Sequence, residues 1–496
     1  MVTIMAQTTI SVLELFHADN FVRRSQVIGE NCPALLIPTT TMSDGKKDLI
    51  VVAPTIKECR TDRWLEQAAE VVVRDLAPDG VVYVLLPYLG RLQFVTLLQR
   101  HGFQFRTPIL HLPNFKVSRY LVPLEHYPIK YALLRIIPTR SWRRILALIA
   151  LSIPGGTVLF MSLLSAVGLI GQRLGARSFS DWLICESGAP DERSNAIIST
   201  SFHGQLRTAI LHTFTAHEQQ PSAVIKLALE DAFAQRIVVE AAIMQRLRPS
   251  VERSGASMAR MELRAMPDGR PVLRQTALRG QPLALLLGAQ PARMNEIIVR
   301  VAGWLERWSQ DTAQPRTLDF ALLEREVLVP LAQLPLLPNH APYHDWLVAY
   351  CEQLAGRTMQ LVAAHNDLSV WNVLIDHTDL QIIDWEAARL AALPLTDFVY
   401  AVVHITSAVD GYSDRLAAFH TCFTVNSTHA TRVARLVGQL CRALGLEQDF
   451  AQICFHACWL HHAAHEHSQR DGLEPGPFEQ IASWLAQHPD YQLELG

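Results

Sequence analysis

Residues 361–388 read LVAAHNDLSVWNVLIDHTDLQIIDWEAA. The polar residues of this stretch are regularly spaced. His365, Asp367 and Asn372 form an H-x-D-x-x-x-x-N pattern, and Asp384 follows Asn372 by twelve residues. A histidine, two carboxylates and an amide within so short a segment indicate a chemical site.

Two short apolar runs surround the second half of this stretch. Residues 373–375 and 381–383 are separated by the turn-like residues 376–379, and this pattern predicts a β-hairpin. Asn372 and Asp384 lie directly outside the two runs, so we expect both side chains to be held at rigid strand ends.

The residue types match the needs of phosphoryl transfer from ATP. That reaction requires a carboxylate near the attacking hydroxyl and oxygen ligands that hold Mg²⁺ against the phosphates. We predict the first role for Asp367 and the second for Asn372 and Asp384. His365 and Glu386 are predicted to support the loop around them.

The same stretch resembles the catalytic core of the aminoglycoside phosphotransferase and choline kinase superfamily, which shares the protein-kinase-like fold. The resemblance extends over about residues 178–496 and implies a bilobal domain, with an N-lobe in residues 178–285 and a C-lobe in residues 286–496. The other interpretation is an Asp-rich loop between strands that has no catalytic role.

The resemblance also implies a lysine on a strand of the N-lobe and a glutamate on the next helix. Residues 224–228, VIKLA, predict a buried strand that carries Lys226, and the apolar spacing of residues 236–244 is helical and includes Glu240. The implied roles are contact of Lys226 with the ATP phosphates and positioning of Lys226 by Glu240. The alternative for Lys226 is an ordinary strand lysine.

Two further features belong to the C-terminal region. Residues 394–398, PLTDF, resemble a family segment in which the aspartate, here Asp397, caps or braces a helix. Seven cysteines and histidines lie within residues 454–467, and we interpret them as part of a packed helix rather than a zinc site, because tetrahedral ligation needs ligands from two elements. The resemblance implies that the C-terminal helices form the acceptor pocket.

The first 140 residues alternate apolar strand-like runs with helical patterns, which predicts a Rossmann-like α/β domain. Residues 76–105 resemble the C-terminal half of a class I methyltransferase domain. Residues 1–45 contain no glycine-rich turn that could hold S-adenosylmethionine, so we expect a degenerate scaffold. An active methyltransferase fused to a kinase is the alternative.

Residues 141–177 form an apolar linker between the two parts of the chain. No charged residue occurs in residues 145–172, and arginines flank the run on both sides. We predict either a buried helical pair or a membrane-interface hairpin that makes a peripheral membrane contact, because each leg is short for a complete crossing.

Composition limits the remaining possibilities. The 496 residues suffice for two or three domains, and a net charge of −3 suggests no nucleic-acid partner. Eight scattered cysteines favour a cytoplasmic location. We therefore expect α/β plus α+β architecture and an ATP- and Mg²⁺-dependent phosphotransferase acting on a hydroxyl of a small molecule. A non-catalytic nucleotide-binding scaffold is the second hypothesis.

Overall fold

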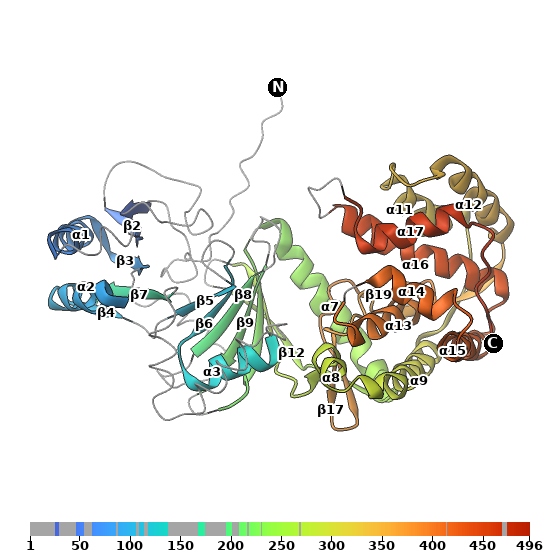
Figure 1. The fold of residues 1–496 in the computed structure, drawn as a ribbon, viewed down its shortest axis with the longest axis horizontal. Helices are drawn as coiled ribbons and strands as arrows, with labels where there is room; N and C mark the ends of the chain where they lie inside the picture. The colour runs from blue at the N-terminus through green and yellow to red at the C-terminus, as the bar shows by residue number, and fades with distance from the viewer. Residues whose placement is uncertain are drawn as a thin grey trace. The chain divides into compact units, whose positions relative to one another are not determined.

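A computed structural model describes most of the chain, which divides into two compact units. The first unit comprises residues 1–238 and 260–277, and the second comprises residues 239–259 and 278–496 (Figure 1). The described residues are 25–28, 46–53, 62–85, 88–105, 109–113, 118–136, 167–173, 195–200, 208–215, 218–229, 231–266, 269–412, 414–468 and 474–496.

The described part of the first unit is built on one sheet. Its strands are β1 (Ser25–Ile28), β2 (Lys47–Val52), β3 (Leu76–Val84), β4 (Phe103–Phe105), β5 (Ile109–Pro113), β6 (Ser118–Pro123), β7 (Val167–Arg173), β8 (Asn195–Thr200), β9 (Thr208–Phe214), β10 (Ala223–Ala228), β12 (Met261–Ala265) and β13 (Pro271–Thr276). Their order is β1-β2-β3-β7-β5-β6-β8-β9-β10-β13-β12, and β4 pairs with β7. The helices are α1 (Asp62–Asp75), α2 (Tyr88–Arg100), α3 (His126–Tyr131) and the π-helical turn η4 (Ala132–Ile136).

The first three strands are parallel, and helix α1 connects β2 to β3. Buried residues of α1 recur three and four positions apart, at Leu65, Ala68, Ala69 and Val72, so they form one apolar face of the helix. This face packs in one cluster with buried residues of β2 and β3. The described strands therefore have α/β character, while the closer resemblance to a methyltransferase remains a prediction.

Part of the linker that was expected to be helical is instead a strand, β7. Val167–Arg173 pairs antiparallel with β3 and with β4, so these residues are not helical. A short apolar run is consistent with a buried strand as well as a buried helix, and periodicity alone does not separate the two. The remainder of the predicted linker, residues 141–166 and 174–177, lies outside the described residues. Among the described helices, none is long and apolar enough to span a membrane.

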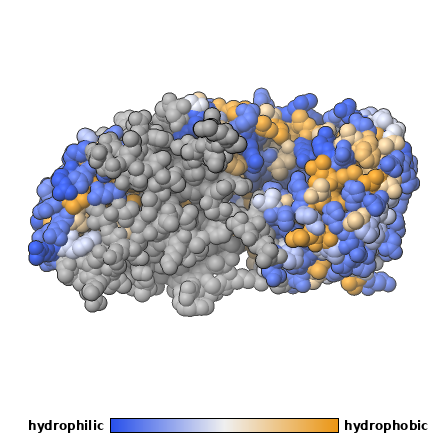
Figure 2. Space-filling model, turned by 90° about the horizontal axis from the view of Figure 1, so that it is seen from above, coloured by the Kyte–Doolittle hydropathy of each residue, from blue (hydrophilic) through white to orange (hydrophobic). Residues whose placement is uncertain are grey.

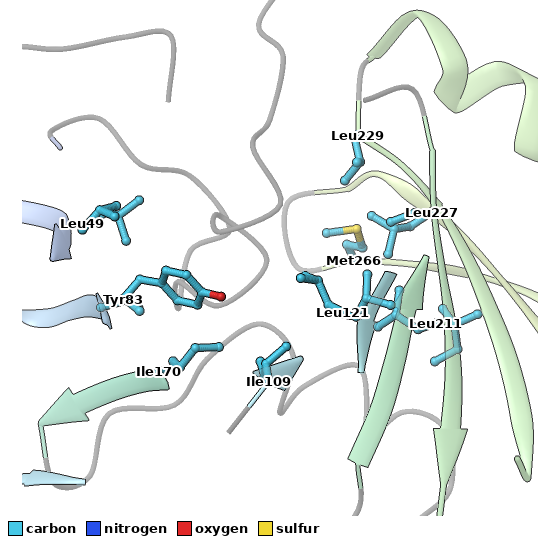
Figure 3. Packing of buried hydrophobic residues seen from close by; sticks show 14 of the residues in the cluster. Leu49, Tyr83, Ile109, Leu121, Ile170, Leu211, Leu227, Leu229 and Met266 are labelled. Atoms are coloured by element: carbon cyan, nitrogen blue, oxygen red, sulfur yellow. The ribbon is translucent and has the colours of Figure 1, made fainter. Parts of the chain in front are cut away.

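The second half of this sheet is antiparallel and contains Lys226. Strand β10 lies between β9 and β13, with Lys226 opposite Ile210 and Leu273, which confirms the predicted strand. Buried side chains of this half and of the first strands belong to one apolar cluster. Figure 3 shows Leu211 and Leu227 on neighbouring strands of this cluster.

The second unit is mainly helical. Helix α7 (Asp231–Arg253) begins in the first unit and continues into the second. The other helices are α8 (Leu283–Ala289), α9 (Met294–Thr312), α10 (Phe320–Leu323), α11 (Val329–Ala332), α12 (His340–Leu354), α13 (Thr396–Val409), α14 (Arg415–Phe423), α15 (Thr428–Leu444), α16 (Gln448–Ser468) and α17 (Pro477–Gln487), with the short turns η5 (Pro291–Arg293) and η6 (Glu324–Leu328).

Two small sheets complete this unit. One has the order β11-β18-β17-β14 and the other β15-β16-β19. Their strands are β11 (Ala256–Met258), β14 (Gln281–Pro282), β15 (Gln314–Thr317), β16 (Thr358–Ala364), β17 (Val373–Asp376), β18 (Asp379–Ile382) and β19 (Arg389–Ala392).

The core of the second unit lies around α13. Twelve of the fourteen residues of this helix are buried, and it contacts α8, α9, α14 and α16. Trp304 and Trp308 of α9 stack at 5.1 Å, and Trp308 meets Trp385 edge to face at 5.8 Å. The visible surface is mixed, with hydrophilic residues interrupted by apolar ones (Figure 2). Trp385 of the stretch 361–388 is thus packed into this apolar core.

Candidate functional site

The predicted hairpin is present and brings its two flanking residues together. Strand β17 pairs antiparallel with β18, with Val373 opposite Ile382. The N–H of Ile383 donates to the carbonyl oxygen of Asn372 at 3.0 Å, which extends the ladder past the strand ends. Asn372 and Asp384 therefore lie at the same end of the hairpin, because antiparallel pairing places these positions side by side.

Asp367 is held by two side-chain hydrogen bonds. Asn372 Nδ2 donates to its Oδ2 at 2.9 Å and to its backbone carbonyl oxygen at 2.9 Å. The hydroxyl of Tyr400 donates to its Oδ1 at 3.1 Å. Because Asn372 uses its Nδ2 for these bonds, its Oδ1 can ligate a cation.

The charge of Asp367 is set by its surroundings. Burial raises the pKa of this carboxyl to about 6, and the charge of Asp384 acts in the same direction, while the hydrogen bonds from Tyr400 and Asn372 oppose the increase. Asp384 is close enough for its charge to act on Asp367. The structure thus brings Asp367, Asn372 and Asp384 together, and two carboxylates and an amide oxygen are ligand types that suit Mg²⁺.

The His365 ring supports this loop through hydrogen bonds to backbone groups. The ring is fully buried, its Nε2 lies 2.9 Å from the carbonyl oxygen of Ile383, and its Nδ1 accepts the N–H of Asp367 at 3.3 Å. These partners require the neutral tautomer with hydrogen on Nε2. His365 therefore links the loop to the end of the hairpin.

Asp397 braces the loop instead of capping its helix. Its carboxylate accepts the backbone N–H groups of His365 at 2.7 Å and Asn366 at 2.8 Å. The N-cap of α13 is Leu395, which makes no side-chain capping bond. Asn366 has a φ of 60°, so the two bonds from Asp397 offset an unfavourable backbone conformation. The expected capping of the helix is not observed, and the bonds of Asp397 hold the loop to the first turn of α13.

Asp384 also has a left-handed backbone, with a φ of 63°. It is half-buried, whereas Glu386 two residues later is exposed. Trp385 between them is buried, and its Nε1 donates to the carbonyl oxygen of Ile382 at 3.2 Å. The Trp385 bond fixes the turn in which Asp384 leaves the strand. The supporting role predicted for Glu386 stays a prediction.

Lys226 and Glu240 lie where the predicted elements place them. Lys226 is on β10 of the first unit and is 6% exposed, and Glu240 is on α7 in the second unit and is 1% exposed. Their predicted pairing stays a prediction.

Tyr400 was missed by sequence reasoning. It lies three residues after Asp397 on α13, and this spacing places the two side chains on neighbouring parts of one helix face. That spacing was the signal that could have identified it. Tyr400 stacks on His462 at 3.7 Å, so a residue of the C-terminal cysteine and histidine group lies beside Asp367's partner.

Cys454, His456 and Cys458 of that group are packed in the helical core, whereas His465 is exposed. His456 is hydrogen-bonded to the hydroxyl of Tyr343 at 2.7 Å and to Gln452 Nε2 at 3.0 Å. The thiol of Cys458 donates to the carbonyl oxygen of Thr396 at 3.4 Å. Within the described residues, no three His, Cys, Asp or Glu side chains gather as a metal site.

Comparisons with known proteins give one family and several distant structures. A search of curated proteins found no match. Solved structures with similarity to this chain include wild-type aminoglycoside 2'-phosphotransferase-IIIa with GDP (14% identity, TM-score 0.35, 62% of this chain and 97% of that one). Others are aminoglycoside phosphotransferase APH(3'')-Id from Streptomyces rimosus (14%, TM-score 0.36, 57% and 97%) and a choline/ethanolamine kinase family protein from Mesorhizobium loti (14%, TM-score 0.35, 63% and 93%).

The family match covers the segment that contains the site. Residues 212–456 match the sequence model of the phosphotransferase enzyme family, from β9 to α16. Lys226, Asp367 and Asp384 all fall within the matched residues. Residues 212–456 of this chain are thus similar to the phosphotransferase enzyme family.

Proposed function

We propose that this protein transfers the γ-phosphoryl group of ATP to a hydroxyl of a small molecule. The observation that carries the proposal is the environment of Asp367, a buried carboxylate held by Asn372 and Tyr400 next to Asp384. A positioned carboxylate beside further oxygen ligands is the arrangement that phosphoryl transfer requires.

In the proposed reaction, Asp367 orients the acceptor hydroxyl and accepts its proton. The hydroxyl oxygen forms a bond to the γ-phosphorus while the bond from that phosphorus to the β–γ bridging oxygen breaks, and ADP leaves with the electron pair. A carboxyl with a pKa of about 6 is ionised at neutral pH and is a stronger base than an ordinary aspartate.

Asn372 and Asp384 would hold Mg²⁺, which neutralises phosphate charge when it is bound. Lys226 would contact the α- and β-phosphates, and Glu240 would position Lys226. We assign these residues to a kinase-like N-lobe in residues 178–285 and a C-lobe in residues 286–496. Residues 1–140 would form a methyltransferase-like domain, and residues 141–177 its connection to the lobes.

Nucleotide binding tests this proposal and separates it from a non-catalytic scaffold. We expect ATP to raise the melting temperature only with Mg²⁺ present, and Asp384→Asn to abolish most of this increase because one metal ligand is lost. The measurement is a thermal melt with and without Mg²⁺. Asp379→Asn, an exposed position of β18 in the same hairpin, is the matched control.

Turnover supplies the second half of the test. Asp367→Asn should retain the Mg²⁺-dependent increase in melting temperature while ADP release with an acceptor falls roughly 10²–10⁴-fold, the usual contribution of a positioned base. A variant that kept wild-type ADP release would exclude Asp367 from the reaction. Absence of any nucleotide effect on the wild type would favour the scaffold.

A further inference from the structure

Tyr400 connects Asp367 to a group of aromatic and basic side chains in the second unit. The group, called the acceptor cluster below, comes from α13, α14, α16, α17 and the turn before α14. Its members are Tyr400, His404, Tyr412, Arg415, His462 and Phe478.

Ring contacts make the acceptor cluster continuous. The ring of Tyr400 lies 4.3 Å from that of His404 and 5.7 Å from that of Phe478. His404 in turn lies 5.8 Å from Phe478 and 6.3 Å from Tyr412. The guanidinium carbon of Arg415 lies 5.4 Å from the Tyr412 ring and 5.2 Å from the Phe478 ring. Arg415 is thus two ring contacts away from the tyrosine that holds Asp367.

Several polar atoms of the acceptor cluster are buried without hydrogen-bond partners among the described residues. They are both ring nitrogens of His404, the hydroxyl of Tyr412 and Nε of Arg415. His404 is only 4% exposed. Buried polar atoms are almost always paired, so three such side chains, of which His404 and Arg415 both lie beside Tyr412, indicate a ligand that supplies the partners.

The fixed charge of the acceptor cluster is positive. Arg415 forms no ion pair with a described residue, and burial lowers the pKa of His404 to about 3 and that of His462 well below its ordinary value, so both rings are neutral. Two acidic side chains on the adjoining elements have other partners. Asp414 caps α14 through the N–H of Ala417, and Glu466 accepts the N–H of Phe478.

Two aromatic rings of the acceptor cluster that could bind a cation already contact the guanidinium of Arg415. Tyr412 and Phe478 each have the Arg415 guanidinium over the ring. A quaternary ammonium or an amino sugar would have to displace that cation or lie beside it, and like charges at short distance repel. A carboxylate or phosphate, in contrast, fits the planar donor array of arginine.

On the basis of the proposed phosphotransfer, we infer that the acceptor is an alcohol that also carries an anionic group, a carboxylate or a phosphate. Arg415 binds the anion, the hydroxyl of Tyr412 and the ring of His404 bind polar atoms of the same molecule, and the reacting hydroxyl lies at Asp367. The cluster therefore selects against aminoglycosides and choline-like acceptors.

Small probes test the charge preference without knowledge of the full acceptor. The protein is first saturated with Mg²⁺ and a non-hydrolysable ATP analogue, so that added anions do not compete for the nucleotide site. Melting temperature is then measured against inorganic phosphate, malonate and tetramethylammonium chloride at constant ionic strength. We expect an increase with phosphate or malonate and none with tetramethylammonium.

Variants locate the effect. Arg415→Gln should weaken the apparent affinity for the stabilising anion about tenfold or more, since charge-assisted hydrogen bonds are lost, and Tyr412→Phe should weaken it severalfold. Tyr412→Phe removes one oxygen atom and is expected to fold. Arg316→Gln, at an exposed position of β15, is the matched control and should bind as the wild type does.

Each outcome decides the inference. Stabilisation by phosphate indicates a phosphorylated alcohol, and stabilisation by malonate a hydroxy acid. Anion effects that persist in Arg415→Gln, a preference for tetramethylammonium, or no response to any probe would each overturn it. The increase produced by Mg²⁺ and the nucleotide analogue reports separately on the proposed function, so its presence without an anion effect rejects the acceptor inference alone.

Discussion

At the scale of single residues, the site depends on how Asp367 is surrounded. Burial alone would favour the protonated carboxyl, and hydrogen bonds from Asn372 and Tyr400 favour the ionised form. The pKa of about 6 is the balance of these effects. Asp397 does not contact the Asp367 side chain through these bonds. It fixes the backbone of His365 and Asn366, the two residues that precede Asp367.

This balance predicts a pH effect of Tyr400→Phe. The change removes the hydroxyl that donates to Asp367 Oδ1 and keeps the ring that stacks on His462. Because that bond favours the ionised carboxylate, its loss should raise the pKa of Asp367 above 6, by about one pH unit.

The measurement is a ¹³C titration of carboxyl-labelled aspartate, with Asp367→Asn used to assign the resonance. As the solution is acidified, Asp367 of the Tyr400→Phe variant should become protonated at a higher pH than in the wild type. Activity should be lost at the same higher pH. Tyr350→Phe, whose hydroxyl donates to the carbonyl oxygen of Asp449, should leave the titration unchanged. An unaltered pKa in Tyr400→Phe would remove Tyr400 from the site.

At the scale of elements, some strands and helices could be predicted from local sequence signals, and others depend on tertiary packing. The hairpin of β17 and β18 was predicted because its apolar runs and turn residues are local. Strand β7 was predicted as helix because its apolar run has no distinguishing period. Helix α12 ends at Leu354 because Gly356 adopts a φ of 83°, a conformation that stops a helix, and the chain then enters β16.

Two glycines test the packing of these elements. A Cβ at Gly171 of β7 would lie 2.7 Å from Phe105 and 2.8 Å from Val82, whereas a Cβ at Gly303 of α9 would come no closer than 3.6 Å to Arg307. Gly171→Ala should therefore destabilise the protein by about 1–3 kcal/mol through overpacking. Gly303→Ala should be neutral or stabilising by about 0.5–1 kcal/mol, because alanine favours the helix.

Urea unfolding monitored by circular dichroism measures both changes, and each variant serves as the control for the other. If Gly171→Ala were as stable as the wild type, the close pairing of β7 with β3 and β4 would be contradicted.

At the scale of the whole molecule, both compact units are built from separate segments of the chain. Residues 239–259 belong to the second unit, although residues 260–277, which follow them, belong to the first. Strand β11 pairs with β18, and Arg253 forms an ion pair with Asp311 at 2.7 Å. Arg307 Nε also donates to the carbonyl oxygen of Ser254 at 2.8 Å.

This connectivity predicts which fragment folds. A fragment of residues 239–496 retains β11 and most of the buried residues of α7, and it should unfold cooperatively. A fragment of residues 278–496 loses them and exposes apolar side chains, so it should show a broad transition or none. Thermal melts followed by circular dichroism compare the two, and equal cooperativity would show that residues 239–259 are dispensable.

The sequence by itself determined the hairpin, the strand of Lys226, the helix of Glu240 and the loop that carries Asp367. These features depend on neighbouring residues, whose spacing reports strand or helix directly. Only the tertiary structure decided that Tyr400 holds Asp367, that Asp397 braces the loop and that Arg415 lies among aromatic rings. These contacts join residues that are distant in the chain, and their formation depends on how α13, α14, α16 and α17 pack against one another. No local period encodes that packing.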